Sequence, residues 1–66
     1  MKMNKATYIN QLPLTTQSQI KEEIIEHLKI NVGLAPYQEE YQEALDNAMN
    51  SRLIDLEEVI DISEYI

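Results

Sequence analysis

The chain has 66 residues, no cysteine, one glycine and two prolines, and it carries a formal net charge of −7. A chain this short forms one small domain, here residues 1–66, and only about 60% of its unfolded surface can be buried. The lack of cysteine excludes disulfides and thiolate metal sites. No apolar run approaches the roughly 20 residues that span a bilayer, and the first residues lack the apolar core of a secretory signal, so we expect a cytoplasmic protein without membrane contact.

The negative charge belongs to the second half of the chain. Residues 1–29 contain four lysines and three glutamates, whereas residues 30–66 contain Arg52 as their one cation against nine acidic residues. Direct binding of nucleic acid depends on clustered lysine and arginine, so this composition argues against it. The composition is compatible with a basic protein partner or with a solvated surface.

The first predicted element is a short helical turn near the N-terminus. Tyr8, Ile9 and Leu12 lie at helical spacing. Pro13 ends the turn, because the residue before a proline is pushed out of the α region.

The next predicted element is a helix from Thr16 to Asn31. The segment that starts at Thr16 and ends at Gln19 matches a capping box, in which Thr16 accepts from a free backbone amide. Gly33 provides the left-handed residue that commonly follows the end of a helix. The apolar residues between these signals recur at helical spacing: Ile20, Ile24, Ile25 and Leu28.

A second helix is predicted from Pro36 to Ile60. Proline is favoured at the first position of a helix, and no glycine or proline interrupts the apolar stripe that follows. Two shorter helices are the alternative, because Asn50 and Ser51 interrupt the stripe and residues 55–58 match a second capping box. We favour the continuous helix. Residues 60–66 are rich in β-branched side chains, so a short terminal strand is a further alternative, although no partner strand is visible.

These elements predict an all-α fold, a helical hairpin with a short N-terminal helical turn. At 1.5 Å per residue the first helix would span about 24 Å and the second about 37 Å. Leu53, Leu56 and Ile60 would then extend beyond the first helix and need a cover. Either the N-terminal turn or a second chain can supply it, and we favour a homodimer that completes a small bundle.

The sequence contains no recognisable catalytic or cofactor-binding motif. His27 is the only histidine, so no pair of nucleophile and base is available, and we expect no enzyme and no cofactor. Glu23 and His27 lie one helical turn apart, which suits a metal ligand pair, but the set is too small, and a half-exposed His27 is the favoured interpretation. Gly33 as the only glycine excludes a phosphate-binding loop, and the acidic residues 55–61 lack the central glycine of a calcium loop.

A candidate partner surface combines two tyrosines with several carboxylates. Tyr37 and Tyr41 lie at i and i+4 and form either an exposed recognition edge or, as we favour, a pair packed over Ile24 and Leu28. The carboxylates form either a solvated face or an imitation of the charge along a nucleic acid. The residues of this candidate surface are Tyr37, Glu40, Tyr41, Glu43, Glu57, Glu58 and Asp61.

Residues 9–13 (INQLP) and 47–57 (NAMNSRLIDLE) resemble small uncharacterised proteins of Gram-positive bacteria, their phages and mobile elements. The resemblance covers about half of the chain and implies a bacterial or phage setting, but no activity. We therefore predict a non-enzymatic protein–protein interaction module. The alternative is a phage or mobile-element inhibitor that binds a basic partner, either as a nucleic-acid mimic or in the manner of an antitoxin.

Overall fold

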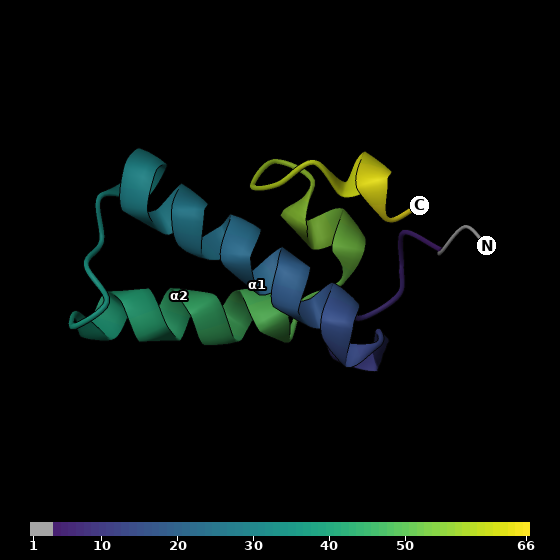
Figure 1. Ribbon diagram of the computed structural model, residues 1–66, viewed down its shortest axis with the longest axis horizontal. Coiled ribbons are helices and arrows are strands. Elements are labelled where there is room, and N and C mark those ends of the chain that lie inside the picture. The colour runs from purple at the N-terminus through teal and green to yellow at the C-terminus, as the bar shows by residue number, and fades with distance from the viewer. Residues whose placement is uncertain (1–3) are drawn as a thin grey trace.

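The computed structural model describes residues 4–66, and this part of the chain is all-α, with two helices packed against each other (Figure 1). Residues 1–3, which entered the prediction that no signal peptide is present, lie outside the described residues. No helix in residues 4–66 is long and apolar enough to cross a membrane. The elements are a 3₁₀ turn at Ile9–Gln11, α1 at Leu14–His27 with a π-helical turn at Leu28–Val32, α2 at Glu39–Met49, and 3₁₀ turns at Leu53–Leu56 and Ile62–Glu64.

The N-terminal turn and the start of α1 follow the sequence prediction with one difference. The predicted turn is present as Ile9–Gln11, and α1 begins directly after Pro13 instead of at Thr16. The capping box predicted at Thr16 is therefore absent, because this residue already lies inside the helix. Gln17 Nε2 instead donates to the backbone carbonyl of Leu12 over 2.7 Å, which ties the first turns of α1 to the segment before Pro13.

The first helix ends at the glycine that the sequence indicated. Gly33 has a φ of 77°, in the left-handed region, and it follows the π-helical turn Leu28–Val32. The amide of Leu34 donates to the carbonyl of Leu28 over 2.9 Å and so satisfies one carbonyl at the helix end.

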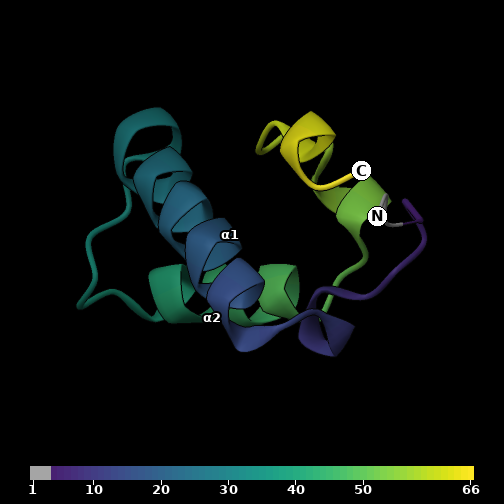
Figure 2. The ribbon, with the colours of Figure 1, turned by 45° about the vertical axis from the view of Figure 1, so that its right-hand side comes forward.

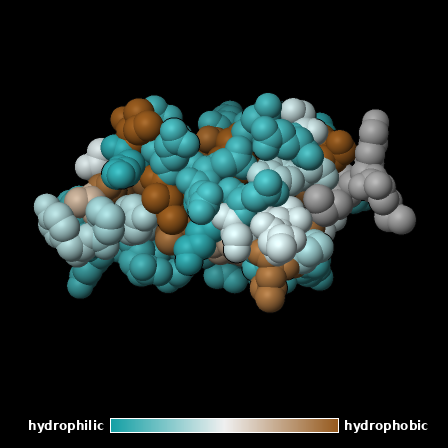
Figure 3. Space-filling view, viewed as in Figure 1, coloured by the Kyte–Doolittle hydropathy of each residue, from teal (hydrophilic) through white to brown (hydrophobic). Residues whose placement is uncertain are grey.

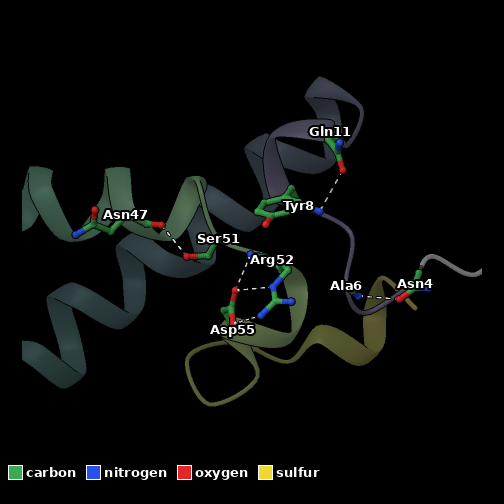
Figure 4. Close-up of polar contacts among 8 residues, drawn as sticks. All are labelled: Asn4, Ala6, Tyr8, Gln11, Asn47, Ser51, Arg52 and Asp55. Carbon is green, nitrogen blue, oxygen red and sulfur yellow. Dashed lines mark hydrogen bonds and ion pairs between the residues drawn. The ribbon is translucent and has the colours of Figure 1, made fainter.

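The prediction of one continuous helix from Pro36 to Ile60 is wrong. α2 starts at Glu39 and ends at Met49, at the position that the sequence marked as weak. Two polar side chains explain this end, because they bind carbonyls of the preceding turn. Asn50 Nδ2 donates to the Asp46 carbonyl over 2.8 Å. Ser51 Oγ donates to the Asn47 carbonyl over 2.7 Å (Figure 4).

After α2 the chain turns back onto the N-terminal segment. The amide of Ile9 donates to the Ser51 carbonyl over 2.9 Å, and the amide of Leu53 donates to the Thr7 carbonyl over 3.0 Å. An isolated antiparallel bridge joins Tyr8 to Arg52 between these bonds. The two parts of the chain are therefore held together by backbone hydrogen bonds.

The 3₁₀ turn Leu53–Leu56 is started by an ion pair and not by the capping box predicted at residues 55–58. The Asp55 carboxylate accepts from the backbone amide of Arg52 over 3.0 Å and from its Nε over 3.2 Å (Figure 4). This arrangement lowers the pKa of Asp55, mainly through the hydrogen bond from the Arg52 side chain. Residues 60–66 contain the 3₁₀ turn Ile62–Glu64 and not the alternative strand.

The core removes the reason for which the sequence favoured a dimer. Leu53, Leu56 and Ile60 are 0%, 4% and 8% exposed within a single chain. Figures 1 and 2 show that the C-terminal turns lie on the same side of α2 as α1, so the chain itself covers this stripe. The buried cluster unites all parts of the fold: Ile9, Leu12, Ile20, Ile24, Leu28, Tyr41, Leu45, Leu53, Leu56, Ile60, Ile62 and Tyr65.

Candidate functional site

A groove lined with carboxylates separates α1 from the C-terminal segment, and we call it the acidic trough. One part of it, with a volume of about 290 Å³, is lined by Gln19, Glu22, Glu23, Glu26, Glu64 and Tyr65. The adjoining part, with a volume of about 250 Å³, is lined by Glu23, Glu26, His27, Ile30, Asn31, Val59 and Ile60. Both parts are lined by Glu23 and Glu26, so they adjoin each other along α1.

Two elements position the carboxylates of the trough. Glu22 and Glu23 are adjacent on α1, and Glu26 follows them by four and three residues, which places all three on one side of that helix. Glu64 comes from the 3₁₀ turn Ile62–Glu64 on the opposite wall. The trough therefore exists only because the chain reverses after α2.

One hydrogen bond fixes the C-terminal wall to α1. The Tyr65 hydroxyl donates to Glu23 Oε2 over 2.5 Å, and the Tyr65 side chain is part of the core. The pKa of Tyr65 is raised, first by burial and then by the hydrogen bond to Glu23 and the charges of Glu23 and Glu64. The neutral hydroxyl is therefore the form that the fold stabilises.

The negative charge of the trough is not neutralised by neighbouring cations. Within residues 4–66 the ion pair is that between Arg52 and Asp55, and neither residue lines the trough. Lys21 and Lys29 belong to the same helical stretch as the trough carboxylates but do not line the groove. A solvated cation or a basic side chain would thus meet several carboxylates at once.

The structure separates the two tyrosines of the predicted surface. Tyr41 is 7% exposed and belongs to the same buried cluster as Ile24 and Leu28, as the favoured packing predicted. Tyr37 is 89% exposed and precedes α2, so the packing prediction is wrong for this residue. The two rings cannot form a joint recognition edge.

The predicted carboxylates also fall into two groups. Glu40 and Glu43 are exposed on α2, whereas Glu57, Glu58 and Asp61 are exposed in the segment after the turn Leu53–Leu56. Because α2 ends at Met49, the two groups do not share a helix face. Asp61 accepts from the amide and the hydroxyl of Ser63, which lowers its pKa.

The described residues offer no assembled metal site. No group of three or more histidine, cysteine or acidic side chains in residues 4–66 has a geometry that could hold a metal ion. His27 is half-buried, as expected, and its Nδ1 lies 3.0 Å from Asn31 Nδ2. It lines the trough as a polar neighbour of Ile30.

A second groove lies between the two helices, and we call it the α1–α2 groove. Its volume is about 460 Å³, and α1 contributes Leu14, Gln17, Ser18 and Lys21, while α2 contributes Gln42, Leu45, Asp46 and Met49. Leu14 is 80% exposed. On the face shown in Figure 3, apolar residues form separate brown patches within a mostly polar surface.

The acidic trough was not predicted from the sequence. Glu23 was considered only as a metal ligand beside His27, and Glu22 and Glu26 were assigned no site, although the spacing of the three could have identified a common side of the helix. The opposite wall could not be found in this way, because Tyr65 lies 42 residues from its partner Glu23. Its position depends on the turn after α2, which the predicted continuous helix excluded.

No family model, curated protein or solved structure matches this chain.

Proposed function

We propose that this chain is a non-enzymatic interaction module that binds a basic segment of another protein in the acidic trough. The observation that supports this function most directly is the convergence of four carboxylates, Glu22, Glu23, Glu26 and Glu64, from two separate parts of the chain on one depression. In a chain with a net charge of −7, a partner that carries lysine and arginine is the complementary class.

The lining of the trough suits a segment that is both basic and apolar. Neighbouring carboxylates one turn apart on α1 can receive two basic side chains of the same segment. Ile30, which is 71% exposed, and Val59 offer an apolar end for one aliphatic side chain. Because an exposed ion pair contributes about 0–1 kcal/mol, binding requires several pairs together with this apolar contact.

The nucleic-acid-mimic alternative receives no comparable support. It assumed that the acidic residues follow one long helix, whereas α2 ends at Met49 and Glu57 and Glu58 lie in a separate segment. We therefore propose a basic protein segment as the ligand of the trough and do not propose mimicry.

The test is fluorescence anisotropy with a labelled peptide that contains four lysines or arginines and one leucine. The double variant Glu22→Gln/Glu26→Gln removes two trough charges from exposed side chains, and Glu40→Gln/Glu43→Gln removes the same charge from α2. We expect the trough variant to bind about 5- to 30-fold more weakly, and the α2 variant to bind nearly as the wild type does. Affinity should also fall steeply with salt.

Two results would contradict the proposed function. Equal losses in both variants would mean that the peptide responds to net charge and not to the trough. Absence of binding to any basic peptide at low salt would show that a basic protein segment is not the ligand.

A further inference from the structure

We propose that the α1–α2 groove is the contact surface for a second copy of this chain. The groove shares no lining residue with the acidic trough, so this proposal does not rest on the proposed function. It also differs from the dimer predicted from the sequence, which used a stripe that the structure buries.

The groove is bordered by one side of each helix, and three of its lining residues are apolar: Leu14, Leu45 and Met49. On α1 the lining residues 14, 17, 18 and 21 follow the spacing i, i+3, i+4, i+7, and on α2 the lining residues 42, 45, 46 and 49 follow the same spacing. Each stripe is about 10 Å long at 1.5 Å per residue. Two helices with matched stripes are the unit from which four-helix bundles are built.

The charge of the groove favours a copy of the same chain over a basic partner. Two chains of charge −7 repel each other, so they can meet only where carboxylates do not crowd the contact. The α1–α2 groove contains one lysine, Lys21, and one carboxylate, Asp46, whereas the acidic trough contains four carboxylates. The charged residues of the groove therefore sum to zero.

A two-fold axis allows the positive and the negative residue of one groove to face the oppositely charged residues of the other. In such a contact every pair of residues occurs twice, so an ion pair between Lys21 of one copy and Asp46 of the other would form at two symmetric places. α1 begins where α2 ends (Figure 1), which places Leu14 and Met49 at one end of the groove and Lys21 and Gln42 at the other.

Antiparallel apposition of the two grooves also covers the exposed leucine. Leu14 of one copy then lies at the Lys21 end of the other groove, where the methylene groups of the lysine cover it while its ammonium group reaches Asp46. This contact removes from water the most exposed aliphatic side chain among those reported for residues 4–66, since Leu14 is 80% exposed in the single chain.

The test is sedimentation equilibrium of the full chain from 10 µM to 1 mM, with Leu14→Glu as the groove variant and Ile30→Glu as the control. Both substitutions replace an exposed aliphatic side chain by one carboxylate, and Leu14 is the first residue of α1, where a carboxylate is favourable for the helix. We expect the wild type and Ile30→Glu to reach twice the chain mass of 7.7 kDa. Leu14→Glu should raise the dimer dissociation constant at least about 100-fold, because two buried leucines are lost.

A charge swap gives a second criterion if Leu14→Glu also disturbs the fold. Lys21→Asp and Asp46→Lys should each weaken the dimer, and the double variant should restore it at an unchanged net charge. Higher salt should leave the dimer unchanged or strengthen it, because it screens the repulsion between two acidic chains, while it weakens binding of a basic peptide in the trough. A wild type that stays monomeric at 1 mM, or a dimer that neither Leu14→Glu nor the single charge changes weaken, would overturn the proposal.

Discussion

The hydroxyl of Tyr65 provides the sharpest test of how the C-terminal segment is held. Tyr65→Phe removes only this hydroxyl and leaves the ring, which is 8% exposed, in the core. A hydrogen bond to a charged group contributes about 1.5–3 kcal/mol, and water near the half-exposed Glu23 favours the lower end, about 1.5–2 kcal/mol. A domain of this length has a total stability of about 3–10 kcal/mol, so the loss is substantial.

The melting temperature of Tyr65→Phe should therefore fall by about 6–16 °C, measured by circular dichroism. Tyr41→Phe is the matched control: Tyr41 is equally buried, and none of the side-chain hydrogen bonds found in residues 4–66 uses its hydroxyl, so we expect little change. A Tyr65→Phe melting temperature within the error of the wild type would refute the role of this bond.

The same residue predicts a pH dependence. The folded state raises the pKa of Tyr65 above its ordinary value of 10.0, so its contribution is complete below pH 10 and is lost as the pH rises further. The wild type should lose stability above about pH 10 more steeply than Tyr65→Phe does. Identical alkaline profiles of the two proteins would contradict the raised pKa.

Three further predictions concern the fold. Leu53→Ala should lose about 3–5 kcal/mol in chemical denaturation, because Leu53 is 0% exposed and its removal leaves a cavity; a loss below 1 kcal/mol would mean that the residue is not buried. Gly33→Ala should cost about 1 kcal/mol, since a methyl group meets nothing within 4 Å and only the left-handed backbone is strained; an unchanged midpoint would contradict that conformation. Stability should hold from pH 7 to 5 and fall below about pH 4, because Asp55 and Asp61 have lowered pKa values and their contribution is complete only above the unfolded pKa of 3.8, below which it is progressively lost; a thermal melt that already drops at pH 5 would contradict this sign.

Local signals in the sequence identified the helical class and several boundaries. Pro13 directly precedes α1, and Gly33 directly follows the π-helical turn after it. Gly33 has the left-handed backbone that often ends a helix, so this end could be predicted from a single residue. The end of α2 was harder, because Asn50 and Ser51 can either continue a helix or bind its last carbonyls. The end of the helix at Met49 is consistent with the burial of Leu53, because Leu53 can enter the core only when the chain turns back after α2.

The candidate site was less predictable than the fold, because it depends on contacts between distant residues. Tyr65 is 42 residues from Glu23, and no periodicity links them. For Tyr37 and Tyr41 a periodicity was present but misleading, because their spacing of four residues predicted that both lie on one side of a helix. Tyr37 lies before the first residue of α2, so the spacing does not apply to it.

The central claim is that the acidic trough binds a basic segment of a partner protein. Its most direct test is a titration of the ¹⁵N-labelled chain with the basic peptide, followed by amide chemical shifts at low salt. The proposed function predicts the largest changes at Glu22, Glu26 and Glu64, and small changes at Glu40 and Glu43 on α2. Equal changes at both sets, or changes confined to α2, would contradict it.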